Sequence, residues 1–178
     1  MREGYDQVIE KAAELAFIYE KTYYGCSQTA LAALIEAFGV GGPDLLRAST
    51  CLAGGVALSG NVCGVLNAGL MMIGYLAGRD DLQMFEQYQR AMDLGKVLYR
   101  RFEEKFGTVQ CPEIHKLKFG KPFNLLNQEE RDELHRLMGE TDDGCQAVAR
   151  DGARMAAELM VELLREGPPL ARMLAAGR

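Results

Sequence analysis

The sequence predicts an all-α protein, a single domain of 178 residues built as a bundle of about six to eight helices. Alanine is abundant, and the runs of Val, Ile and Thr that favour strands are absent. Apolar residues recur three and four residues apart over long stretches, which is the period of an amphipathic helix. We therefore expect less than about 5% strand, against the 20–25% that is usual in globular proteins.

The first half of the chain divides at glycines and a proline. An apolar stripe predicts a helix over residues 5–23, and residues 26–38 form a second helix that ends at Gly39 as its C-cap. Pro43 begins a short helix, where its missing N–H costs nothing. A glycine-rich loop over residues 53–61 follows.

The second half contains the longest helices. Residues 62–77 form a buried central helix stopped by Gly78, and residues 81–106 carry apolar side chains along one face. A short helix begins at Cys111, which precedes Pro112 and is a predicted N-cap. Charged residues 128–138 form a peripheral helix, and residues 145–165 form the last one, ended by Gly167, Pro168 and Pro169. We expect helices 62–77, 81–106 and 145–165 to form the core.

Composition and charge exclude several classes of protein. The net charge of −5 opposes binding to nucleic acid or to an anionic membrane surface, since both need a basic footprint. Residues 48–78 carry no charge, but the glycine-rich loop interrupts them, so we expect a core helix and no membrane insertion. The N-terminus lacks an apolar signal region, which predicts a cytoplasmic protein with reduced thiols.

Four of the five cysteines share a position at predicted helix starts: Cys26, Cys63, Cys111 and Cys145. The unpaired N–H groups and the dipole of a helix N-terminus favour a thiolate and should lower the thiol pKa. Three of these cysteines also head apolar stripes, so they should face the interior. The pattern suggests one shared site at an end of the bundle, and four separately buried thiols are the simpler alternative. We expect Cys51, at the entrance to the loop, beside or behind this site.

These residues resemble the C_GCAxxG_C_C family, whose members are described as redox-active. The resemblance covers residues 25–160 and rests on the Gly25-Cys26-Ser27-Gln28 start, the glycines of the loop, and the central stretch Cys63-Gly64-Val65-Leu66-Asn67-Ala68. Val65 stands where the family has alanine, and Ala68 where it has the last glycine. Cys111 and Cys145 match the third and fourth cysteines, whereas Cys51 is outside the set.

The resemblance implies a small helical protein that works with an oxidoreductase or a transporter as partner. It also implies a prosthetic group such as an iron–sulfur cluster, with Gly64, the first glycine of the motif, among the cofactor-binding residues. The family is similar to split-Soret cytochromes, but this chain has no Cys-x-x-Cys-His motif for attaching haem.

Three hypotheses for function remain open. The first is an iron–sulfur cluster or other metal ion held by Cys26, Cys63, Cys111 and Cys145 for electron transfer, although ligands this far apart in sequence are unusual. The second is thiol–disulfide chemistry by the same four cysteines acting as catalytic thiols. The third is a helical interaction module, in which small residues such as Gly60 and Gly64 support a homodimer contact. The sequence identifies no catalysed reaction.

The two histidines are weaker candidates. His115 lies four residues after Cys111 and could act as a ligand or proton carrier, but flanking lysines favour a solvent-facing side chain. His135 lies in a charged helix and should be on the surface. No nucleotide-binding glycine motif follows a strand, and two histidines placed in this way support no catalytic triad.

Overall fold

The computed structural model describes residues 2–166, which form eight α-helices and one 3₁₀ turn. The elements are α1 (Arg2–Tyr23), α2 (Cys26–Phe38), α3 (Pro43–Ala48), η1 (Thr50–Leu52), α4 (Gly64–Ala77), α5 (Phe85–Phe106), α6 (Cys111–Phe119), α7 (Gln128–Glu140) and α8 (Cys145–Glu166). Within residues 2–166 the β pairing is an isolated antiparallel bridge between Val62 and Gln110, and no strand forms. The predicted all-α fold is confirmed.

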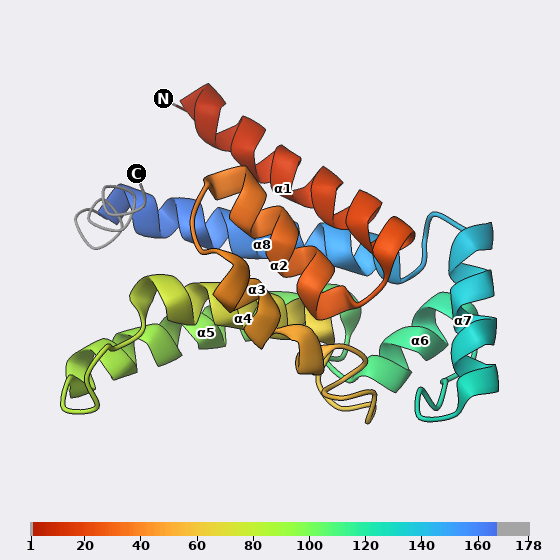
Figure 1. The fold of residues 1–178 in the computed structure, drawn as a ribbon. Helices are drawn as coiled ribbons and strands as arrows, with labels where there is room; N and C mark the ends of the chain where they lie inside the picture. Colours follow the sequence, from red (N-terminus) through yellow and green to blue (C-terminus); the bar gives the residue numbers. More distant parts are fainter. Residues whose placement is uncertain (1, 167–178) are drawn as a thin grey trace.

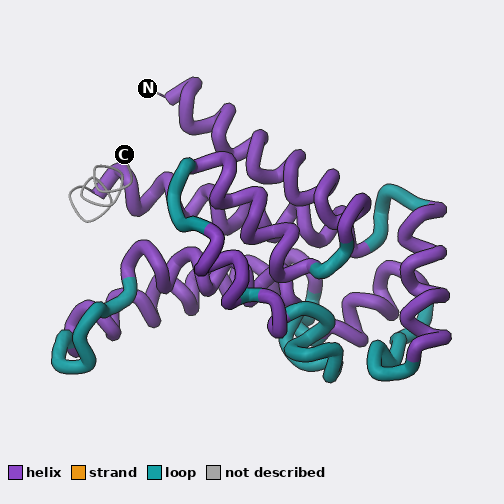
Figure 2. The backbone as a smooth tube through the Cα atoms, in the orientation of Figure 1, coloured by secondary structure: helices purple, strands orange, loops and turns teal. Residues whose placement is uncertain are grey.

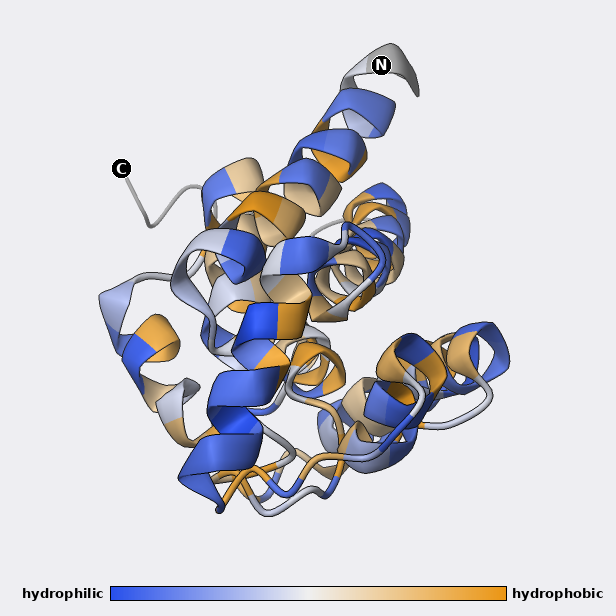
Figure 3. Cartoon of the chain, turned by 90° about the vertical axis from the view of Figure 1, so that its right-hand side faces the viewer, coloured by the Kyte–Doolittle hydropathy of each residue, from blue (hydrophilic) through white to orange (hydrophobic). Residues whose placement is uncertain are grey.

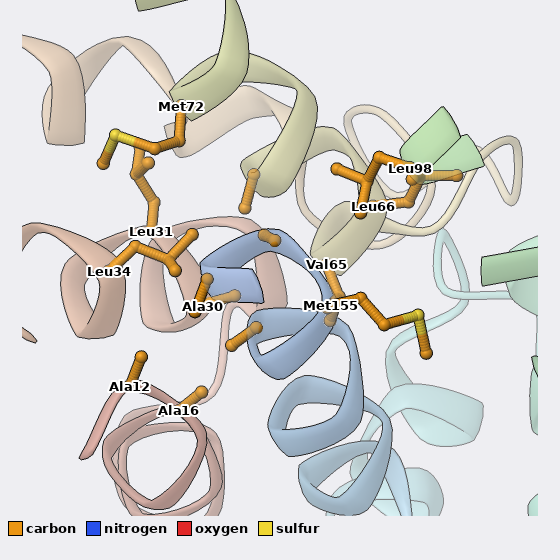
Figure 4. Packing of buried hydrophobic residues seen from close by; sticks show 14 of the residues in the cluster. Ala12, Ala16, Ala30, Leu31, Leu34, Val65, Leu66, Met72, Leu98 and Met155 are labelled. Atoms are coloured by element: carbon orange, nitrogen blue, oxygen red, sulfur yellow. The ribbon is translucent and has the colours of Figure 1, made fainter. Parts of the chain in front are cut away.

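Helix α8 lies at the centre of the bundle and packs against α1, α2, α4 and α5 (Figure 1). Helix α1 can approach α8 and α2 closely because its buried face consists of small residues such as Ala12 and Ala16. Leu31 and Met72 fill the space between α2 and α4 (Figure 4). Hydrophilic and hydrophobic residues alternate along the helices, as expected of amphipathic elements (Figure 3).

Helices α6 and α7 form a smaller lobe beside the bundle (Figure 1). Its apolar centre is separate from the main core and contains Cys111, Phe123, Leu125, Leu134 and Met138. Cys63 belongs to the main core, while Cys145 packs against the centre of the lobe. The predicted cysteine site is therefore at the junction of two hydrophobic clusters.

The expected role of α5 in the core is wrong for its N-terminal half. Leu98 and Phe102 are buried, but Phe85 is 58% exposed and Leu82, which precedes the helix, is 79% exposed. This half extends away from the bundle (Figure 1), and α1 and α2 make more contact with α8 than α5 does. Its apolar face therefore has no helix to cover it among the described residues.

The predicted helix ends are mostly confirmed, but the starts of α1, α4 and α5 are shifted and α6 has a different N-cap. Gly39 ends α2 with a φ of 64°, and its N–H donates to the Ile35 carbonyl. Helix α4 begins at Gly64 and not at Val62, because Val62 is held in the bridge to Gln110. Gln110, not Cys111, is the N-cap of α6, since Cys111 has already entered the helix.

The start of α5 moves because residues 81–84 form a turn before Phe85. The predicted stop at residues 167–169 is outside the described residues. Among residues 2–166, no helix combines the length and the apolar character needed to cross a membrane.

Candidate functional site

The four cysteines at helix starts line one cavity: Cys26, Cys63, Cys111 and Cys145. Each is the first residue or the N-cap of α2, α4, α6 or α8. The cavity offers about 80 Å³ to the centres of water-sized molecules, and one water needs only about 10–15 Å³ on this measure. The structure thus brings together side chains from four helices that are far apart in sequence.

Two backbone hydrogen bonds hold Cys63 and Cys111 side by side. The Cys63 N–H donates to the Val109 carbonyl at 2.8 Å, and the Cys111 N–H donates to the Asn61 carbonyl at 2.9 Å. Both bonds flank the Val62–Gln110 bridge, so the segment before α4 is fixed against the segment before α6. Each cysteine is about 5% exposed. Their proximity therefore depends on the backbone and does not require a bond between the sulfurs.

Buried polar side chains next to the other two cysteines fix the starts of α2 and α8. Ser27 is fully buried and donates to the Ser49 carbonyl at 2.8 Å, which joins the first turn of α2 to the loop before η1. Gln146, also fully buried, donates to the Met138 carbonyl at 3.1 Å and joins α8 to the end of α7. These bonds position Cys26 and Cys145.

The glycine-rich loop closes over Cys26 in an unusual conformation. Five successive residues, 54–58, have φ between 50° and 71°, and three of them are not glycine. The left-handed region costs an L-residue about 1–2 kcal/mol, so this turn is strained. It makes the compact coil between η1 and α4 (Figure 2) and directs the Gly54 N–H to the Cys26 sulfur.

Backbone N–H groups also reach the sulfurs from the first turn of α4. The Gly64 N–H interacts with Cys26, and the N–H groups of Val65 and Leu66 interact with Cys63. A Cβ at Gly64 would collide with the Cys26 sulfur, so only glycine permits this approach. Helix N-termini supply donors to the sulfurs, as the sequence suggested.

The expected low thiol pKa values are wrong in this structure. Burial raises the pKa of Cys63 to about 12, and neighbouring acidic groups raise it further, against the opposing effect of the N–H groups. Burial likewise raises the pKa of Cys111 to about 12 and moves the pKa values of Cys26 and Cys145 far above their usual range. Desolvation therefore outweighs the helix N-termini, because these thiols are inside the protein and not at its surface.

The sulfurs surround a space and do not meet at one point. Within residues 2–166, no three or more His, Cys, Asp or Glu side chains have an arrangement that could hold a metal ion. Cys51 is exposed and is not part of the cavity wall, although its carbonyl accepts the Ala57 N–H inside the loop. Cys51 lies in η1, and its backbone carbonyl helps to hold the loop.

Sequence reasoning missed Glu20, which lines the same cavity and is only 4% exposed. Its charge helps to raise the pKa of all four cavity thiols. A signal was present in the sequence, because Glu20 continues the buried face of α1 at Ala12, Ala16 and Glu20, each four residues apart. Carboxyl groups are rarely buried on the apolar face of a helix, so a buried one is a candidate functional residue.

Both histidines differ from the expectation. His115 is buried, and its Nε2 is 3.5 Å from the Cys111 sulfur while its Nδ1 has no partner. Burial lowers the pKa of His115 to about 4, so the ring is neutral at pH 7. His135 is half-buried, lines the cavity and stacks on Tyr24 with ring centroids 4.1 Å apart. The i, i+4 spacing correctly placed His115 on the same helix face as Cys111. The inference from the flanking lysines, that His115 faces solvent, was wrong.

Comparison with known proteins identifies a family for this chain. A family model described as "Putative redox-active protein (C_GCAxxG_C_C)" matches residues 24–159, which include all four cavity cysteines but not Glu20. No curated protein and no solved structure gave a match. The match covers most of the chain, and the chain therefore belongs to the C_GCAxxG_C_C family, whose members are described as redox-active.

Proposed function

We propose that this redox-active protein holds an iron–sulfur cluster through Cys26, Cys63, Cys111 and Cys145 and serves in electron transfer. The observation that carries the proposal is the presence of all four cysteines, each from a different helix start, in the wall of one cavity. When bound, such a cluster takes up and releases an electron at a potential set by hydrogen bonds to sulfur and by burial.

The residues present suit a cluster better than a single ion. One zinc or iron ion needs four sulfurs about 2.3 Å from a common point, and the cavity sulfurs are not so arranged. A cluster has several irons and therefore takes its ligands from around a larger volume. Metal binding removes the thiol protons, so the raised pKa values would make assembly dependent on pH.

The chain itself would support the cluster in two ways. N–H groups from the glycine-rich loop and from α4 stabilise negative charge on the Cys26 and Cys63 sulfurs. The apolar walls on either side, from the main core and from the lobe of α6 and α7, keep water away. An oxidoreductase or transporter protein in a reducing compartment would supply or receive the electron.

A thiol–disulfide function with the same residues is the second candidate, favoured by the free thiols of four neighbouring cysteines. The raised pKa values count against it, because a neutral thiol is a poor nucleophile. The homodimer contact considered for the third hypothesis does not use Gly64, because Gly64 is buried against Cys26 within the chain.

Serine replacements test the proposal directly. After anaerobic reconstitution with iron and sulfide, each of C26S, C63S, C111S and C145S should bind less iron by roughly tenfold or more, since losing even a supporting residue weakens metal sites about 10–100-fold. C51S is the matched control and should bind as much iron and sulfide as the unmodified chain, because Cys51 is outside the cavity. Equal iron content in all five variants, or none in the unmodified chain, would refute the cluster.

A further inference from the structure

Glu20 is a buried carboxyl group among four thiols and lies outside the segment that matches the family. Its carboxyl group accepts a hydrogen bond from the Thr29 hydroxyl at 2.6 Å. The sulfurs interact with it through space, by charge, and no hydrogen bond joins it to a sulfur within the described chain. Glu20 is therefore close enough to respond to charge at the cysteine centre without being one of its ligands.

Thr29 connects this carboxyl group to the outside of the protein. It lines a second pocket of about 460 Å³, together with Tyr19, Gln28 and Glu36. Glu20 lines the cysteine cavity and Thr29 lines the outer pocket, so the bonded pair crosses the wall between the two. A hydroxyl group can donate one proton while accepting another, which suits it to relay a proton across such a wall.

The cavity thiols and His115 cannot take the same role near neutral pH. The titratable or charged residues that line the cavity with it are Tyr24, Cys26, Cys63, Cys111, His115, Arg131, His135 and Cys145. Burial keeps the cavity thiols protonated and His115 neutral. Burial also raises the pKa of Glu20 to about 7, although the bond from Thr29 opposes the shift.

We propose that Glu20 takes up the proton that accompanies reduction of the cysteine-bound centre, and that the Thr29 hydroxyl relays this proton from the outer pocket. The inference rests on the function proposed above. In the step, the centre gains one electron from an external one-electron donor protein, and the Glu20 carboxylate gains one proton from solvent. The net charge inside the cavity stays constant, which removes the cost of adding an uncompensated charge to a buried site.

Redox titration at several pH values tests the proposal. The reconstituted full chain is reduced with dithionite and mediators between pH 5.5 and 8.5, and the midpoint potential is read from the visible spectrum. Above about pH 7, where Glu20 is ionised before reduction, the potential should fall by about 59 mV per pH unit, the value for one proton taken up with one electron. Below about pH 7, where Glu20 is already protonated, the potential should stay constant. In E20Q the slope should vanish, whereas E14Q, the same change at an exposed position of α1, should keep it.

T29V provides a second variant in case E20Q does not fold. Removing the Thr29 hydroxyl removes the hydrogen bond that lowers the Glu20 pKa. The pH range over which the midpoint potential changes should therefore move to higher pH. Any of three results would overturn the proposal. The potential of the unmodified chain could be independent of pH, the pH dependence could persist in E20Q, or T29V could show its pH dependence over the same pH range as the unmodified chain.

Infrared difference spectra of the metal-free protein separate this inference from the cluster itself. A carboxyl band that titrates near pH 7 in the unmodified chain and is missing in E20Q supports Glu20 as the proton carrier. Absence of that band overturns the inference even if the cluster forms. Failure to assemble any cluster instead refutes the proposed function, and the infrared result still decides the protonation of Glu20.

Discussion

Replacing Gly64 by alanine is expected to abolish binding at the cysteine site and to destabilise the fold. The new Cβ would collide with the Cys26 sulfur and lie 3.1 Å from the Leu52 carbonyl oxygen and the Ser27 nitrogen. Two of these three atoms belong to the backbone, so a change of side-chain rotamer cannot relieve the crowding. Overpacking of this kind costs about 1–3 kcal/mol of stability. The backbone movement that relieves it would displace the N–H groups that approach the Cys26 sulfur.

Gly74→Ala is the matched control in the same helix. Gly74 is exposed, and a Cβ there would meet nothing within 4 Å. Alanine is favoured over glycine inside a helix by about 1 kcal/mol, so G74A should be slightly more stable than the unmodified protein. Urea denaturation and iron content after reconstitution measure both effects. Iron content in G64A equal to that in G74A would show that the close approach at Gly64 does not matter for the site.

The sequence was sufficient for the helices and for the positions of the four cysteines in them. Helical spacing and terminal glycines are local signals that can be recognised in the sequence. Gly39, for example, ends α2 because glycine readily adopts the left-handed conformation that a helix C-cap requires. The position of a thiol at a helix start is equally local. Its location in a common cavity followed from apolar stripes that point inward from Cys26, Cys63 and Cys145.

The features that sequence reasoning missed depend on contacts between distant segments. The apolar face of α5 predicted burial, yet whether Phe85 is covered depends on the position of other helices. The thiol pKa values were misjudged for a related reason, because the helix N-terminus is local and known in advance, whereas desolvation depends on the whole fold. The burial of His115 also depends on the lobe that α7 completes.

Two buried groups should give the metal-free protein opposing dependences of stability on pH. Glu20 has a folded-state pKa of about 7 against an ordinary value of 4.5, so between these values the folded state binds the additional proton. Stability then falls as pH rises, by about 1.4 kcal/mol per unit and about 3 kcal/mol in all. His115 has a folded-state pKa of about 4 against an ordinary 6.5, so the unfolded state binds the additional proton and stability rises with pH.

The two slopes overlap between pH 4.5 and 6.5 and should nearly cancel there in the unmodified protein. E20Q removes the falling contribution, so its free energy of unfolding, relative to that of the unmodified chain, should increase steadily up to pH 7. H115Q removes the rising contribution, so its free energy of unfolding, relative to that of the unmodified chain, should decrease as pH rises from about 4 to 6.5, which is opposite in sign to the change in E20Q. E14Q, at an exposed position of the same helix, should follow the unmodified chain throughout. Urea denaturation of the reduced, metal-free proteins gives these differences, and parallel curves for E20Q and E14Q would mean that Glu20 is ionised in the folded state at acidic pH.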